Sequence, residues 1–316
     1  MVSTPRAQAI TGAEAVRRAI QGGRADWRSV AFEGLLVLLL ILTLAVLAWL
    51  LVVVFIGGMP TILERGVDFF TSPLAARAEE AGVGQAITGS LWLMVFVAVF
   101  SFPLGIGAAV YLEEYARDTW FTRLVNTVVR NLAGVPSIVY GLLGLAIFVV
   151  ALGDVVGPGS TSGRSLIAGG LTMAILVLPI VIITSAEALR AVPQAIREAA
   201  FGVGATRWEV VRSHVLPYAA PGIFTGTILS MARAFGETAP LILVGAVIGG
   251  FNVRYDNVVE TLQGRYTALP TTVFDWARQP PSFSGNVYAA IIVLIVVLLG
   301  VNALAIFLRN RFERRW

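Results

Sequence analysis

The stretch "EAAFGVGATRWEVVRSHVLP", residues 198–217, lies in a polar segment over 187–221 that separates two long apolar blocks. Pro193 suits the first turn of a helix, because proline has no N–H to leave unpaired there. Gly202 and Gly204 suit the end of that helix, since glycine readily adopts the positive φ of a helix-ending turn. The spacing therefore predicts a short helix followed by a glycine turn.

A second helix is predicted to follow the turn. "TRWE", beginning at Thr206, has the spacing of a capping box, in which the first and fourth residues pair around a helix start. Trp208, Val211 and Val215 then lie on one face of the helix, and Pro217 is expected to stop it.

The first helix carries a stripe of apolar side chains, Ile196, Ala199, Ala200 and Val203, at spacings of three and four residues. Two interpretations are open. The stripe packs against the chain's own membrane helices, or the groove of a partner protein closes around it.

Composition places the chain in a membrane. Of its 316 residues 57% are hydrophobic and 13% are charged, and the mean hydropathy is +0.82. Soluble domains carry about a quarter charged residues. The chain has no cysteine and one histidine, His214, which excludes disulfides, thiolate metal sites and multi-histidine metal sites.

A bilayer requires about 20 mainly apolar residues for each helix. The expected membrane spans are 32–57, 86–112, 134–152, 165–186, 222–249 and 287–308. An even number of spans puts both termini on one side. The segments on that side are 1–31, 113–133, 187–221 and 309–316, with 16 arginines, and those on the other side are 58–85, 153–164 and 250–286, with 6. The positive-inside rule places both termini in the cytoplasm.

All 23 basic residues are arginine. A P-loop needs a lysine, so any ATP-driven work requires an ATPase on another subunit. The arginines gather beside the spans and form no basic patch that indicates nucleic-acid binding. The external segments are too small for a separate catalytic domain, and no catalytic constellation is visible, so an enzyme is not expected.

The expected helix 222–249 carries charge inside an apolar block. At 100° per residue, Thr227, Ser230, Arg233 and Glu237 share one arc of about 120°. Arg233 and Glu237 could satisfy each other as an i, i+4 ion pair. Alternatively, Arg233 faces a transport pathway, where its planar fork suits a phosphate-like oxyanion. Intramembrane charge favours the second interpretation.

The 198–217 stretch resembles the EAA loop of ABC-transporter permeases. The matching residues are Glu198, Ala199, Ala200, Gly204, Leu216 and Pro217, while His214 stands where isoleucine is usual. In that family the loop is the coupling helix that docks into a cleft of the ATPase subunit. The resemblance implies this role for residues 194–209, which include Arg197 and Thr206.

Three further stretches resemble the phosphate-uptake permease family PstA, and the likeness covers roughly residues 85–308. They are "MARAFGETAP" at 231–240, "ITGSLWLMVFVAVFSFPLGIGAAVYLEEYA" at 87–116 and "LAGVPSIVYGLLGLAIFV" at 132–149. The resemblance implies an all-α permease of the type I ABC importer (MetI-like) fold with six transmembrane helices. Its permease core is expected over 86–308, in the inner membrane of a bacterium.

The same resemblance implies the partners. They are a PstC-like permease subunit, two copies of a PstB-like ATPase that binds ATP and Mg, and a PstS-like protein that delivers phosphate. No cofactor is expected in this chain. Arg233 and Glu237 match family positions associated with the translocation path, whereas Thr227 and Ser230 are assigned to it from the wheel alone.

Other functions stay open at this point. The chain could be the PstC-type subunit or a permease for another oxyanion, although "GETAP" favours PstA. A secondary transporter or channel would work without an ATPase, which the EAA loop argues against. A structural scaffold would leave the polar stripe unexplained.

Overall fold

The computed structural model describes residues 27–157, 161–247, 249 and 257–312, and these residues form helices without β-strands. The α-helices are α2 Trp27–Arg65, α3 Val67–Thr71, α4 Gly84–Phe96, α5 Phe102–Val110, α6 Trp120–Ala133, α7 Ser137–Gly144, α8 Gly153–Val156, α9 Leu166–Arg190, α10 Gln194–Gly202, α11 Arg207–Val210, α12 Leu216–Phe235, α13 Ala239–Leu243, α14 Val258–Gln263, α15 Leu269–Trp276 and α16 Ser284–Phe312. The π-helical segments are η1 Val97–Ser101, η2 Tyr111–Tyr115, η3 Leu145–Ala151 and η5 Val211–Val215, and η6 Pro281–Phe283 is a 3₁₀ turn.

The chain divides into two units, one ending at Val53 and one beginning at Val54. In the first unit, the described residues form the first part of α2, which exposes leucine and valine on all sides. A helix that is apolar all round suits a lipid environment. Of the expected cytoplasmic segments 1–31 and 309–316, residues 1–26 and 313–316 lie outside the described residues.

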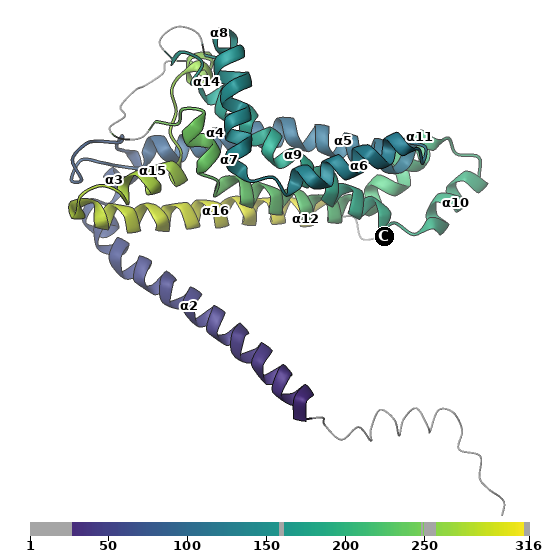
Figure 1. Ribbon diagram of the computed structural model, residues 1–316, viewed down its shortest axis with the longest axis horizontal. Coiled ribbons are helices and arrows are strands. Elements are labelled where there is room, and N and C mark those ends of the chain that lie inside the picture. The colour runs from purple at the N-terminus through teal and green to yellow at the C-terminus, as the bar shows by residue number, and fades with distance from the viewer. Residues whose placement is uncertain (1–26, 158–160, 248, 250–256, 313–316) are drawn as a thin grey trace, which may run out of the picture. The chain divides into compact units, whose positions relative to one another are not determined.

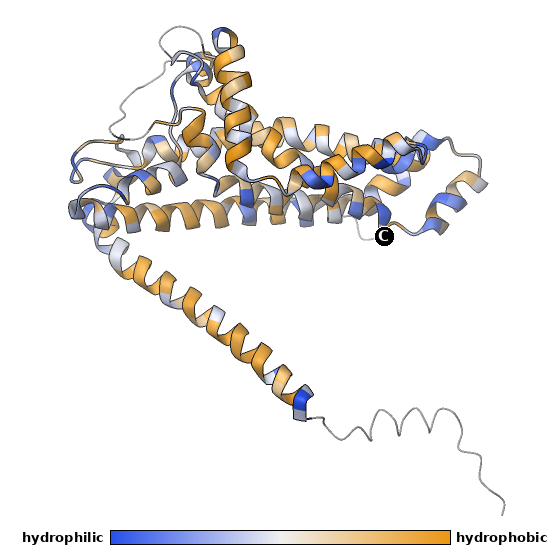
Figure 2. Cartoon of the chain, in the orientation of Figure 1, coloured by the Kyte–Doolittle hydropathy of each residue, from blue (hydrophilic) through white to orange (hydrophobic). Residues whose placement is uncertain are grey.

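In the second unit α9 is the central helix, and it packs against α4, α5, α7 and α12. Helices α10 and α11 lie together at one end of the unit, and α3 and α15 lie at the other (Figure 1). The long helices between these ends are mostly apolar, whereas hydrophilic residues gather at the α10–α11 end (Figure 2). The expected coupling loop therefore projects from the end of the helix bundle.

Five helical segments in the described residues are long and apolar enough to cross a membrane. They are Trp27–Arg65, Gly84–Tyr115, Leu166–Arg190, Arg207–Phe235 and Pro281–Phe307. The pair Trp120–Ala133 and Ser137–Ala151, bent by 102°, makes a sixth if it counts as one span. The all-α class is confirmed, and the number of spans agrees with six when the bent pair is included.

The bent pair differs from the expected single span over 134–152. Its first half, α6, falls in a segment expected only to connect two spans. Helix α6 is strongly amphipathic, with Trp120 and Phe121 exposed on it. Gly134 ends α6, and Pro136 precedes α7. Proline disfavours helical geometry in the residue before it, and together with Gly134 it favours a break between the two halves.

Two of the prolines inside the continuous spans follow π-helical segments. Pro103 and Pro217 are each the second residue after a π-helical segment, η1 and η5 respectively. A proline ring crowds the carbonyl four residues earlier in a regular α-helix, and a π turn locally changes that register. The prediction that Pro217 stops the second helix of the loop is therefore wrong, because α11, η5 and α12 run on into the next span.

The expected span 222–249 is not one helix. Helix α12 ends at Phe235, Gly236 caps it, and the chain resumes as α13 at Ala239. In a continuous helix, the Pro240 ring would meet the carbonyl of Gly236, four residues earlier. The break therefore follows from the local sequence, and it falls within the charged stretch.

Candidate coupling surface and transport pathway

The polar loop folds as the sequence predicts, as a helix, a glycine turn and a helix. Helix α10 starts after Pro193 and ends at Gly202, and Gly204 has a φ of 84°. The Glu209 carboxylate accepts from the Thr206 backbone N–H at 2.8 Å, and the Thr206 hydroxyl accepts from the Glu209 N–H at 3.4 Å. This reciprocal pairing is the predicted capping box.

The apolar stripe of α10 splits between two environments. Ala200 is buried and Ile196 half-buried, and both pack in an apolar cluster with the end of α9. Ala199 is exposed, and Val203 is 85% exposed. The first interpretation is therefore confirmed for Ile196 and Ala200, whereas the exposed side with Ala199 and Val203 leaves the partner groove as a prediction.

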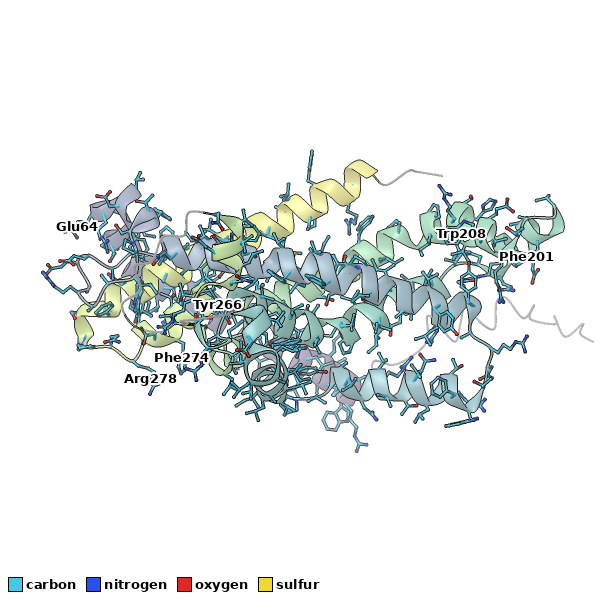
Figure 3. The ribbon with its side chains drawn as sticks, turned by 90° about the horizontal axis from the view of Figure 1, so that it is seen from above. Glu64, Phe201, Trp208, Tyr266, Phe274 and Arg278 are labelled. Atoms are coloured by element: carbon cyan, nitrogen blue, oxygen red, sulfur yellow. The ribbon has the colours of Figure 1, made fainter. Side chains whose placement is uncertain are left out.

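Two large side chains add to the exposed side. Phe201 on α10 and Trp208 on α11 are 47% and 57% exposed. Figure 3 shows both at the same end of the second unit, opposite Phe274 and Arg278. Phe201 is not part of the predicted stripe, because it does not fall at the spacings of three and four residues that define the stripe. Glu198, of the predicted coupling residues, is also exposed.

Arg197 faces the interior of the chain. Its Nη2 donates to Glu114 Oε1 at 2.8 Å and to the Leu189 carbonyl at 2.9 Å, and its Nη1 donates to the Val192 carbonyl at 2.7 Å. Nearby, Arg190 forms two hydrogen bonds with Glu113. The sequence analysis did not single out Arg190 or the two glutamates.

Arg233 lies shortly before the last residue of α12, and Glu237 lies shortly after it. Arg233 is in the last turn of α12, and its side chain is 56% exposed. Glu237 follows Gly236 in the break, and its side chain is 18% exposed. Arg233 Nε lies 3.7 Å from Glu237 Oε1, which is an ion pair but too long for a hydrogen bond. The wheel that put Glu237 on the same continuous helix is wrong.

Thr227 and Ser230 are buried in the chain. The Thr227 hydroxyl donates to the Phe224 carbonyl at 2.9 Å, and the Ser230 hydroxyl donates to the Gly226 carbonyl at 2.7 Å. Their helix packs against α9. The structure does not bring these two hydroxyls to the surface where Arg233 is exposed.

Residues 101–316 match a family described as "Binding-protein-dependent transport system inner membrane component". The chain belongs to this family. The family places it among multi-pass membrane components of such transport systems, and the apolar helices agree with that assignment.

Two relatives of this permease family carry the same name. The "Phosphate transport system permease protein PstA" of Mycobacterium leprae (strain TN) is 34% identical over 87% of this chain and 86% of its own length. The protein of that name from Yersinia pestis is 30% identical, over 90% of this chain and 92% of its own length.

A solved permease shows the same fold. It comes from a bacterial alginate ABC transporter in complex with an alginate-bound periplasmic protein, with a TM-score of 0.64 at 17% identity. The match covers 94% of this chain and 99% of that one. Together with the family match, this confirms the permease fold that the sequence resemblance implied.

Proposed function

We propose that this chain is the PstA-like permease subunit of an ATP-driven importer of inorganic phosphate. The similarity to phosphate permeases over nearly their full length carries the proposal. Because both compared relatives bear the name PstA, they favour this subunit over the PstC-type alternative. The partners of the complex are a PstC-like permease, two PstB-like ATPases and a PstS-like binding protein.

The exposure of Arg233 supports a pathway between two permease subunits. A charged side chain facing lipid near the middle of a bilayer costs about 2.5 kcal/mol or more. Arg233 is more than half exposed in the chain alone, so a partner surface or an aqueous path must cover it in the membrane. An arginine fork there can donate two hydrogen bonds to a phosphate oxyanion. Glu237 orients Arg233 from the break, and Thr227 and Ser230 serve packing.

The α10–α11 end is the docking site for the ATPase in this proposal. Phe201, Val203 and Trp208 form an exposed apolar surface there, beside Glu198 and Ala199. An apolar helix face with flanking polar residues suits a groove on a partner. The chain has no lysine and hence no P-loop, so ATP and Mg bind to the ATPase. This end, and with it both termini, faces the cytoplasm.

The test is phosphate uptake by the complete complex in proteoliposomes. We expect Arg233→Gln to abolish uptake while the four kinds of subunit still copurify. Arg77→Gln is the matched control, because Arg77 forms an exposed ion pair with Glu80 at 3.0 Å away from α12. Full uptake by the Arg233 variant would refute the pathway assignment.

Two further measurements separate the alternatives. In the first, unlabelled oxyanions compete for uptake by the wild-type complex. If other oxyanions reduce uptake and phosphate does not, the substrate is a different oxyanion. Uptake by this chain alone, in vesicles that contain no ATP, would indicate a secondary transporter.

A further inference from the structure

We propose that Glu113, Glu114, Arg190 and Arg197 form a charged brace that transmits movement of α10 to the membrane span Gly84–Tyr115. This inference rests on the proposed function, in which α10 receives movement from the ATPase. The brace residues lie on three elements: the glutamates on η2, Arg190 at the end of α9, and Arg197 on α10.

Arg197 is the centre of the brace. Its guanidinium donates to the Glu114 carboxylate at 2.8 and 3.5 Å and to the carbonyls of Leu189 and Val192 at 2.9 and 2.7 Å. The Arg197 and Glu114 side chains are only 15% and 9% exposed. Charge-assisted bonds from one planar group to several acceptors fix orientation as well as distance. Arg197 thus holds α10 to the end of α9 and to η2 together.

Arg190 makes the second link. Its Nε and Nη2 donate to the two oxygens of Glu113 at 2.8 and 2.5 Å, a bidentate pair. Glu113 is 14% exposed, and Arg190 is 45% exposed. The two adjacent glutamates of η2 therefore pair with arginines on α9 and on α10. A shift of η2 relative to either helix would strain the ion pair that joins them.

A third contact reinforces the same element. The Arg207 guanidinium of α11 lies 5.7 Å from the ring centroid of Tyr115, within cation–π range. The four brace residues line a cleft of about 400 Å³ together with Gln194, Phe201 and Arg207. The links seen between η2 and the loop are therefore the Arg197–Glu114 ion pair and the Arg207–Tyr115 contact.

The span attached to η2 is long. Segments α4, η1, α5 and η2 form one run, Gly84–Tyr115, which is long and apolar enough to cross a membrane as a single span. A displacement of α10 that pulls on Glu114 therefore acts on a whole span and not on a loop. Arg197, predicted among the residues that couple to the ATPase, connects the docking helix to the rest of the permease in this proposal.

An apolar cluster is expected to keep the loop folded when the brace is removed. Ala109, Leu189, Val192, Ala200 and Val210 are buried together beside it. Substitution of the two glutamates leaves this cluster intact, so the loop is expected to keep its structure and the docking surface that it presents.

The test measures phosphate uptake per ATP hydrolysed by the complete reconstituted complex. We expect the double variant Glu113→Ala/Glu114→Ala to keep assembly and ATP hydrolysis, while uptake per ATP falls by about 10-fold or more, within the range of typical coupling between sites. Asp118→Ala is the control: it breaks an exposed pair with Arg123 at 3.1 Å that does not involve α10. That variant should match the wild type.

A thiol cross-link distinguishes transmission from a purely structural role. The chain has no cysteine, so Glu114→Cys/Arg197→Cys introduces the only two thiols of this subunit. Joining them with a short bifunctional thiol reagent should restore uptake per ATP that the unlinked variant lacks. Unchanged coupling in the glutamate variant, loss of hydrolysis together with assembly, or failure of the cross-link to restore coupling would each overturn the brace. If phosphate were not the substrate, the wild-type complex itself would take up no phosphate, which distinguishes that failure from failure of the brace.

Discussion

The crossing of α9 and α12 yields the sharpest structural prediction, the substitution Gly226→Ala. Gly226 lies on α12 against α9, beside Thr227 and Ser230. A methyl group added there would clash with Thr184 Oγ1 and would lie 2.5 Å from Thr184 Cβ. The second atom is fixed to the α9 backbone, so a rotamer change cannot relieve the clash and the two helices must separate.

The expected change in the free energy of unfolding is the difference between two opposing effects. Overpacking a well-packed interior costs about 1–3 kcal/mol. Replacing glycine by alanine in a helix gains about 0.5–1 kcal/mol. We therefore expect the free energy of unfolding to fall by about 1–2 kcal/mol.

The measurement is equilibrium unfolding of the permease in mixed micelles by detergent titration. Gly107→Ala on α5 is the matched control, because an added methyl meets no atom within 4 Å there. That variant should be equal to or more stable than the wild type. The double variant Gly226→Ala/Thr184→Gly removes the Cβ that the methyl strikes, and we expect it to recover part of the loss through coupling between the sites.

Two results would refute the reasoning. Gly226→Ala could prove as stable as Gly107→Ala, which would mean that α9 and α12 do not approach closely at this point. Alternatively, Thr184→Gly could add its own cost without any recovery, which would mean that the two positions are not in contact.

Three other substitutions test the loop and the break. Thr206→Ala removes the capping hydroxyl and should lower stability by about 1 kcal/mol, measured in the same titration. Gly204→Ala forces a side chain into a φ of 84° and should cost about 1–2 kcal/mol, whereas Gly202→Ala should cost nothing; equal effects would contradict the turn geometry. Glu237→Gln should weaken uptake and ATP hydrolysis together if Glu237 positions Arg233, as its low exposure suggests; hydrolysis that continues without uptake would identify a gate instead.

Features that depend on neighbouring residues were predictable. The capping box at Thr206 and the turn at Gly204 involve residues three or four apart, and the structure has both. The break after Phe235 is of the same kind, since Pro240 and the Gly236 carbonyl are four residues apart. It was missed because hydropathy does not change there, and the helical wheel assumed continuity.

The role of Arg197 could not be predicted in this way. The EAA resemblance placed it on the coupling helix, among the residues that couple to the ATPase. Its partner Glu114 lies 83 residues away in the sequence, and the Arg190–Glu113 pair is separated by 77. No periodicity connects residues so far apart.

The sequence by itself determined the membrane class, the helix–turn–helix of the coupling loop and the family resemblance, because composition, local spacing and motif are properties of the chain alone. Only the tertiary structure decided which side of α10 is exposed, that Thr227 and Ser230 are buried while Arg233 is not, and that η2, α9 and α10 meet at four charges. The physical reason is that burial and ion pairing depend on how helices pack against one another, and that packing is set by contacts between residues distant in sequence.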